Sequence, residues 1–104
     1  MPYDLEFLPL AEKDIRTAAM YIANDLKAPI AAANLVRKIR SKTNNLRKMP
    51  YMYREYREEL QNETIYRAMP VKKYIVFYTV NEEKKTVEIH RVIYARTEIN
   101  ALLK

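Results

Sequence analysis

Hydrophobic and acidic residues alternate at the start of the chain. Tyr3, Leu5 and Phe7 are separated by the acidic residues Asp4 and Glu6. A period of two with one apolar face is typical of a strand that is buried on one side. The pattern therefore predicts a half-buried β-strand within residues 2–8.

The period then lengthens to three or four residues, which is typical of a helix with one buried face. Over residues 10–26 this face comprises Ala11, Ile15, Ala18, Ile22 and Leu26. A second helical pattern begins at Pro29 and continues to Met49-Pro50, where proline ends it. Its apolar positions are Ala32, Leu35, Ile39 and Leu46. The short connection between the two patterns predicts an antiparallel helix hairpin.

The second half of the chain is rich in β-branched and aromatic residues. Residues 51–63 show no clean period and are expected to form a loop with some helix, whereas residues 64–69, 71–80 and 85–95 are expected to be strands. The run from Tyr74 to Tyr78 predicts a central strand buried on both faces, and residues 98–104 predict a short closing helix. We therefore expect one α+β domain over residues 1–104. It has an N-terminal strand, an antiparallel helix hairpin, a three-strand antiparallel stretch that completes a four-stranded sheet, and a short C-terminal helix.

Composition excludes several classes of chemistry. The 104 residues suffice for one domain and contain no cysteine, no glycine and one histidine, His90. Thiolate catalysis, zinc–thiolate sites, multi-histidine metal sites within one chain and glycine-rich phosphate loops are therefore excluded, and we expect no metal or cofactor. The sequence has neither a long apolar run nor a secretory signal, so we expect a cytoplasmic protein without membrane contact.

The formal net charge of +6 is unevenly distributed. Between Ala28 and Arg54 there are seven basic residues and no acidic one. A solvated helix face explains such a run, but its one-sidedness also fits a patch that attracts nucleic acid or an acidic protein. The residues predicted to bind a partner are Arg37, Arg40, Arg47, Lys48, Arg54, Lys72 and Lys73.

A second basic and aromatic group falls within the predicted strands. Its members are Tyr66, Arg67, Lys72, Lys73, Tyr74, Arg91, Tyr94 and Arg96. A ribonuclease without a metal needs such groups, because it must neutralise charge on the phosphate and move a proton to the leaving oxygen. The simpler interpretation is that the tyrosines are half-buried packing residues with their hydroxyls at the surface.

Other candidate groups for proton transfer are weaker. His90 is typical of a structural or solvated histidine on a strand. Glu58, Glu59 and Glu63 could supply a general base, although a solvated loop explains them as well. Strict alternation along the last strand would place Val87, Ile89, Arg91 and Ile93 on one face. The other face would then carry Glu88, His90, Val92 and Tyr94.

Short motifs in a fixed order cover nearly the whole chain. They include Tyr3-Asp4-Leu5-Glu6-Phe7, Ala11-Glu12-Lys13-Asp14-Ile15, Leu46-Arg47-Lys48-Met49-Pro50, Lys73-Tyr74-Ile75-Val76-Phe77-Tyr78 and Ile89-His90-Arg91-Val92-Ile93-Tyr94-Ala95-Arg96-Thr97-Glu98-Ile99. In these pieces the chain resembles toxins of the RelE/ParE superfamily, which come from type II toxin–antitoxin modules. The resemblance implies a small toxin that is held silent by a cognate antitoxin, and an antitoxin with acidic stretches would suit the basic surface.

One branch of the superfamily, the RelE-like toxins, cuts messenger RNA on the ribosome. If the chain resembles this branch, the candidate catalytic residues are Arg67, Arg91, Tyr94 and Arg96. The chain departs from the RelE-like pattern, because Ile75, Tyr94 and Asn100 stand where an arginine, another basic residue and a tyrosine are expected.

The other branch, the ParE-like toxins, acts on DNA gyrase without cutting RNA. The long helix hairpin, the run over residues 91–96 and the ending Asn100-Ala101-Leu102-Leu103 resemble this branch more closely. We therefore expect a growth-inhibiting toxin that poisons DNA gyrase. A metal-independent, ribosome-dependent endoribonuclease and a non-toxic binding module are the alternatives.

Overall fold

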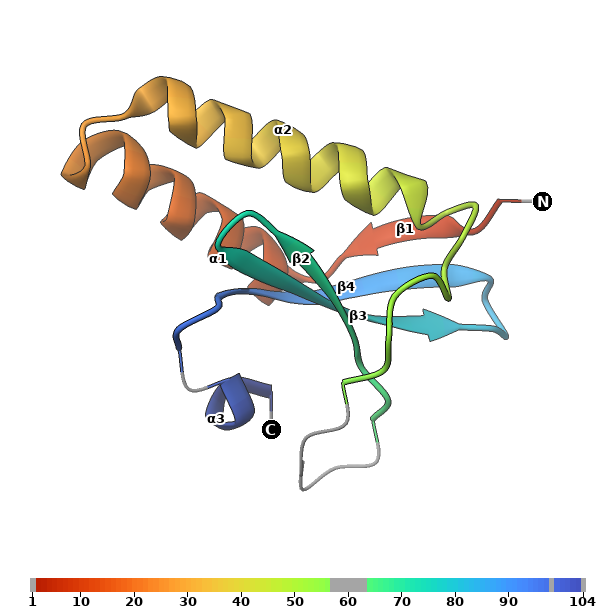
Figure 1. The fold of residues 1–104 in the computed structure, drawn as a ribbon. Helices are drawn as coiled ribbons and strands as arrows, with labels where there is room; N and C mark the ends of the chain where they lie inside the picture. The colour runs from red at the N-terminus through yellow and green to blue at the C-terminus, as the bar shows by residue number, and fades with distance from the viewer. Residues whose placement is uncertain (1, 57–63, 98, 104) are drawn as a thin grey trace.

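The structure is a computed structural model that describes residues 2–56, 64–97 and 99–103. Its elements are β1 (Asp4–Phe7), α1 (Pro9–Met20), the π-helical segment η1 (Tyr21–Asp25), α2 (Pro29–Asn45), β2 (Arg67–Val71), β3 (Tyr74–Asn81), β4 (Thr86–Tyr94) and α3 (Ile99–Leu103). The strands form one sheet in the order β1–β4–β3–β2, with β1 parallel to β4 and the other pairs antiparallel. The hairpin of α1 and α2 lies over one face of the sheet and α3 lies on the other side, which confirms the expected α+β fold (Figure 1).

The first helix is shorter and less regular than its apolar pattern predicts. Its buried residues are Ala11, Ile15 and Ala18. The α-helix then gives way to η1, whose wider turns are marked by a hydrogen bond of 3.1 Å from the Leu26 amide to the Tyr21 carbonyl. These turns rotate Leu26 away from the buried face. The prediction that Leu26 belongs to the core is therefore wrong, and the residue is 55% exposed.

The second helix ends at Asn45 rather than at Met49-Pro50, and the chain continues in turns. Its buried residues are Ala32, Leu35, Ile39 and Thr43, and Leu46 is buried at the C-terminal cap. The Thr43 hydroxyl is compatible with burial because it donates to the Ile39 carbonyl at 2.7 Å. Thr43 thus fills the buried position between Ile39 and Leu46 that the apolar pattern left open.

The break between the second and third strands does not lie at Pro70, as the pattern predicts. Pro70 is part of β2, where it is opposite Ile75. Proline is tolerated there because β2 is an edge strand, and no further strand lies on its outer side to require the missing amide hydrogen. The chain turns instead at Lys72 and Lys73, and Lys72 adopts a positive φ of 54°.

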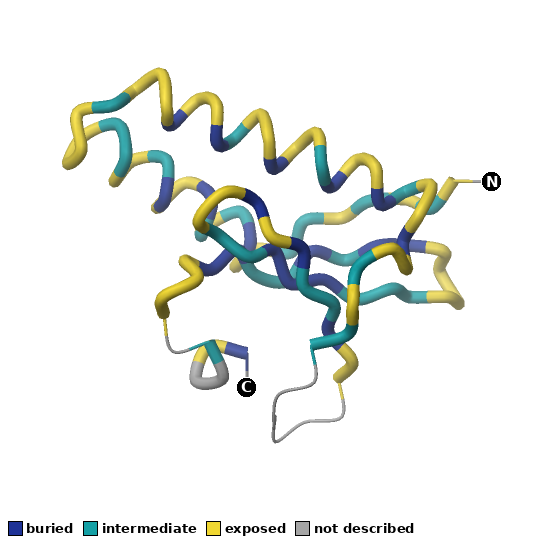
Figure 2. Tube along the Cα trace, in the orientation of Figure 1, coloured by how far each residue is buried: buried dark blue, intermediate teal, exposed yellow. Residues whose placement is uncertain are grey.

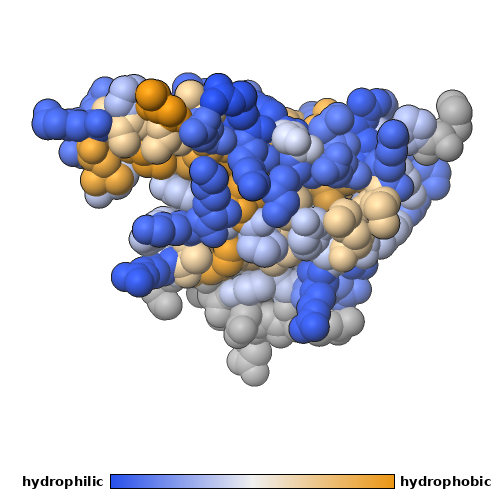
Figure 3. Space-filling view, turned by 45° about the horizontal axis from the view of Figure 1, so that its top comes forward, coloured by the Kyte–Doolittle hydropathy of each residue, from blue (hydrophilic) through white to orange (hydrophobic). Residues whose placement is uncertain are grey.

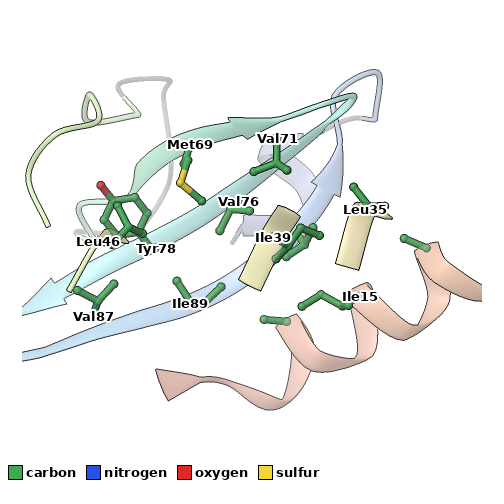
Figure 4. Packing of buried hydrophobic residues seen from close by; sticks show 13 residues of the cluster. Ile15, Leu35, Ile39, Leu46, Met69, Val71, Val76, Tyr78, Val87 and Ile89 are labelled. Carbon is green, nitrogen blue, oxygen red and sulfur yellow. The ribbon is translucent and has the colours of Figure 1, made fainter. Parts of the chain in front are cut away.

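The main core lies between the helix hairpin and the sheet. Ile15, Leu35 and Ile39 project from the helices towards Val76 and Ile89 of the central strands (Figure 4). The buried positions of α1 and α2 accordingly lie on the sides that face the sheet (Figure 2). A smaller cluster beneath α3 comprises Tyr66, Phe77, Ile93 and Leu103. Over Val76–Tyr78, β3 is buried on both faces as predicted, because consecutive side chains enter different clusters.

A β-bulge interrupts β4 at His90. Tyr78 pairs with Ile89, whereas its neighbour Phe77 pairs with Arg91, so β4 has one residue more than β3 at this point. A bulge reverses the faces on which all later side chains lie relative to strict alternation.

The reversal overturns one prediction about β4. Val87 and Ile89 face the helix hairpin, and so does Val92. Ile93 instead lies beneath α3, and Arg91 is on that same face because it pairs with Phe77. The prediction that Ile89 and Arg91 share a face is therefore wrong.

Among the residues that the structure describes, no helix is long and apolar enough to cross a membrane. The predicted closing helix corresponds to α3, while Glu98 and Lys104 lie outside the described residues, as do Glu58, Glu59 and Glu63.

Candidate functional site

A groove of about 920 Å³ opens beside the free end of the helix hairpin. One wall is formed by α1, η1 and the start of α2, and the other by the adjoining ends of β3 and β4 together with α3. We call it the hairpin groove. Its prominent lining residues are Leu10, Tyr21, Leu26, Lys73, Tyr74 and Tyr94. Hydrophobic side chains gather at this end of the hairpin, whereas hydrophilic ones cover much of the rest of the face shown in Figure 3.

Three tyrosines give the groove aromatic surface with polar tips. Tyr74 and Tyr94 pack edge to face with their ring centroids 5.5 Å apart. Burial raises the pKa of Tyr74, and the neighbouring Tyr94 and Tyr21 raise it further, so its hydroxyl remains a donor at neutral pH. Tyr21 and Tyr94 are 50% and 39% exposed, which leaves much of their surface available to a partner.

Asp14 and Arg91 form an ion pair in the groove wall. Arg91 Nε and Nη2 donate to Asp14 Oδ2 and Oδ1 at 2.8 and 3.0 Å, and the Val92 amide donates to Oδ2 at 2.9 Å. The hydrogen bond with Asp14 raises the pKa of Arg91. Arg91 Nη1 also donates to the Leu102 carbonyl at 3.1 Å. The pair therefore joins α1, β4 and α3.

Arg67, another candidate catalytic residue, is held by the segment that follows α2. Its Nη1 donates to the Tyr53 carbonyl at 2.8 Å, and its Nη2 lies 3.5 Å from Glu55 Oε2. Its guanidinium also stacks over the Tyr51 ring, 4.8 Å from the centroid. These contacts hold the Arg67 side chain against the segment that follows α2.

The sheet separates Arg67 from Arg91. Arg67 pairs with Tyr78 of the helix-facing cluster, whereas Arg91 pairs with Phe77 of the cluster beneath α3. Directly paired residues share a face of a sheet, so the two arginines point to opposite faces.

The remaining candidate catalytic residues lie at the end of β4. Tyr94 lines the hairpin groove, and Arg96 is exposed in the turn that follows β4. The four candidate residues are thus divided among three places. The structure does not bring them together around one point, and their catalytic role stays a prediction.

His90 is half-buried outside the hairpin groove. Its Nε2 lies 2.9 Å from the Thr79 hydroxyl, and its ring packs edge to face with Tyr66 at 5.2 Å. Burial lowers the pKa of His90, although nearby Glu88 opposes the shift, and the lowered pKa favours the neutral ring. These contacts agree with the interpretation of His90 as a structural histidine.

The residues predicted to bind a partner have different surroundings. Arg40 pairs with Glu12 at 3.0 Å and lies over the Phe7 ring, 4.5 Å from its centroid. Arg47 is half-buried, and its Nε donates to the Tyr3 carbonyl at 2.9 Å. Five others are exposed to solvent, namely Arg37, Lys48, Arg54, Lys72 and Lys73. Lys73 also lines the hairpin groove, so it is the one residue of the seven predicted to bind a partner that lies at this apolar cavity.

Sequence reasoning missed Tyr21 and Leu26 as groove residues. The apolar spacing placed Leu26 on the buried face of a regular α-helix and gave no sign of the π-helical segment that exposes both residues. It also missed Asp14. A usable signal exists, since position 14 lies on the same helix stripe as the buried Ala11 and Ala18 yet carries an acid. A carboxylate on an apolar stripe indicates a buried partner.

Solved structures of several toxins share this fold. The chromosomal ParDE toxin–antitoxin system from P. aeruginosa gives a TM-score of 0.72 at 16% identity, covering 90% of this chain and 97% of that chain. A mutant E. coli RelE toxin in the free state gives a TM-score of 0.66 at 17% identity over 98% and 93% of the two chains. The RelBE2 toxin–antitoxin complex from Mycobacterium tuberculosis gives a TM-score of 0.54 at 22% identity, and the match covers 90% of this chain and 99% of that chain. These likenesses define the RelE/ParE toxin fold.

The family follows from the sequence match. Residues 5–99 match the ParE toxin family of type II toxin–antitoxin systems, parDE. No curated protein gives a significant match. The chain belongs to the ParE toxin family and is a toxin of a type II system, which confirms the resemblance to the RelE/ParE superfamily.

Proposed function

We propose that this toxin stops growth by binding DNA gyrase and trapping it on cleaved DNA, and that a cognate antitoxin neutralises it. Membership of the ParE family and the fold shared with the ParDE system support this assignment. The observation that favours it over RNA cleavage is the placement of Arg67 and Arg91 on opposite faces of the sheet. A nuclease must bring its charge-stabilising and proton-transferring groups within hydrogen-bond reach of one phosphate.

The direct test is a supercoiling assay with purified toxin, relaxed plasmid, ATP and gyrase. We expect loss of supercoiling or accumulation of cleaved plasmid as toxin is added. Unchanged supercoiling with about a tenfold molar excess of toxin, well above stoichiometric binding, would refute gyrase as the target.

A parallel assay tests the ribonuclease alternative with translating ribosomes and mapped 5′ ends of the message. Cleavage that falls about 100-fold in both Arg67→Ala and Arg96→Ala would replace the gyrase proposal with the nuclease. Activity in neither assay, together with normal growth during expression without antitoxin, would favour the non-toxic binding module.

The hairpin groove is the surface that we propose for the antitoxin. Its apolar floor suits an amphipathic helix, and Lys13 and Lys73 on its two walls suit acidic residues beside the apolar ones. An acidic substitution of Leu26, which lines the groove, should place an uncompensated charge in the interface.

The matched control is Ile30, which is 77% exposed at the same end of the hairpin but outside the groove lining. We expect Leu26→Asp to weaken binding of the antitoxin encoded beside the toxin by at least about tenfold, with little effect of Ile30→Asp. Equal effects of the two substitutions would exclude the groove as the antitoxin site.

A further inference from the structure

We propose that the solvent-facing side of α2 and the turn after it bind the phosphodiester backbone of a nucleic acid. The surface, which we call the outer face of α2, consists of Arg37, Lys38, Ser41, Asn44, Asn45 and Lys48. This proposal concerns a surface distinct from the hairpin groove and does not depend on gyrase being the target.

Helix geometry places these residues on one side. The buried stripe of α2 runs through Leu35, Ile39 and Thr43 towards the sheet, and all six residues of the outer face are exposed. Arg37 and Asn45 are separated by about two turns, or about 12 Å along the helix axis, and Lys48 extends the face into the following turn. That length is enough to follow several phosphates of one strand.

The residue types on this face are those that contact phosphates. Arginine, lysine, serine and asparagine side chains supply most hydrogen bonds from proteins to phosphate oxygens. No acidic residue occurs anywhere between Leu26 and Arg54. An ordinary solvated helix face intersperses acids with its bases, whereas α2 contains no acid.

Some basic residues of this region are engaged in contacts within the fold, and others are not. Arg40 forms an ion pair with Glu12 of α1, and the Lys42 ammonium donates to the Pro70 carbonyl at 3.0 Å. Arg37 contacts Asn34 on its own helix, which leaves most of its guanidinium donors directed to solvent. The outer face therefore retains positive charge that the fold itself does not use.

A nucleic acid fits this face better than a protein does. Specific protein interfaces are built around apolar or aromatic residues, whereas nucleic-acid interfaces are more polar and more positive. Between Arg37 and Lys48 no large apolar side chain of α2 is exposed. The exposed apolar residues Ile30 and Met49 lie at the two ends of the face rather than within it.

The source of the phosphodiester can be DNA, such as the duplex held by gyrase, or structured RNA. We would measure binding of the purified full chain to a short duplex DNA and to an RNA hairpin over a range of salt concentrations. The test variant is Arg37→Gln/Lys48→Gln, and the control is Arg16→Gln/Lys84→Gln, which removes one exposed arginine and one exposed lysine elsewhere. Each variant lowers the formal charge of +6 by two, to +4.

Loss of two phosphate contacts should lower the slope of log K against log salt by about 1.8 and weaken binding about 30-fold at about 0.15 M salt. The control variant should retain most of the binding, and circular dichroism should show both variants folded. Equal weakening by test and control variants would overturn the proposal, because net charge alone would then explain the binding. Failure of the unmodified chain to bind either nucleic acid would also overturn it. Binding to RNA alone would assign the surface to RNA, and binding to duplex DNA would assign it to DNA.

Discussion

Replacing Asp14 with asparagine tests the ion pair that joins three elements of the fold. Asp14→Asn removes the charge that Arg91 requires while keeping the size of the side chain. The carboxylate accepts two hydrogen bonds from Arg91 and one from the Val92 amide. After the substitution, an amide group faces the guanidinium and Arg91 loses its counter-charge.

The loss in free energy of unfolding depends on how far the ion pair is buried. The side chains of Arg91 and Asp14 are 17% and 15% exposed. Breaking a buried pair by removing one partner costs about 3–5 kcal/mol, and we take the lower end because both groups retain some water contact. About 3 kcal/mol is a large share of the stability of a small domain and should lower Tm by roughly 12–24 °C.

A second arginine–carboxylate pair supplies the matched control. Arg40 and Glu12 meet at 3.0 Å, but their side chains are 44% and 41% exposed. Exposed pairs contribute about 0–1 kcal/mol, so Glu12→Gln should change the free energy of unfolding by no more than that amount.

Urea denaturation of the purified proteins, followed by circular dichroism, measures both substitutions. If Asp14→Asn costs less than about 1 kcal/mol, or no more than Glu12→Gln, then burial does not determine the strength of these pairs and the reasoning fails. A double-mutant cycle with Arg91→Met should return a coupling of about 1–3 kcal/mol.

Substitutions at three further places in the fold test other features. Tyr78→Phe removes a buried hydroxyl that donates to the Pro50 carbonyl at 2.8 Å, and urea unfolding should show a loss of about 1–2 kcal/mol. Lys72 has a φ of 54°, which glycine adopts more easily than lysine, so Lys72→Gly should stabilise the chain by about 0.5 kcal/mol. Lys73→Gly, at the neighbouring turn position, should destabilise the chain. A gain in stability from both substitutions would contradict the backbone explanation. Hydrogen bonds from Lys85, and then from Tyr51 and Tyr3, lower the pKa of Glu82 to about 2 from an ordinary 4.5. A lowered pKa stabilises the folded state above the ordinary value, and this contribution is lost as pH falls towards the folded value. Glu82→Gln should therefore lower Tm at pH 7 but not near pH 2, and thermal melts showing the same difference at both pH values would exclude this linkage.

The sequence predicted those parts of the fold that repeat a simple period. The alternation around Leu5, the helix stripe through Ile15 and the aromatic run of β3 each correspond to an element with the expected face buried. Errors arose where one residue changes the period. η1 exposes Leu26, and the bulge at His90 moves Arg91 to the other face. Neither irregularity has a local sequence signal such as glycine, because the chain contains none.

The candidate site was harder to predict for the same reason. Basic charge on α2 is visible in the sequence, but the use of Arg40 and Arg47 in internal contacts depends on tertiary structure. The hairpin groove brings together α1, β4 and α3, which are far apart in the chain, and its residues share no motif. The placement of Arg67 and Arg91 depends on strand register. A single inserted residue moves every later side chain of the strand to the other face of the sheet.

The outer edge of β2 bears on how the toxin behaves when it accumulates without a partner. Pro70 has no amide hydrogen, its carbonyl already accepts from Lys42, and the start of the strand is covered by the Tyr56 amide, which donates to the Tyr66 carbonyl at 2.7 Å. A second molecule therefore finds few backbone groups there with which to extend the sheet. Open strand edges are common starting points for aggregation, so this arrangement opposes joining of free toxin molecules through the β2 edge while they remain folded.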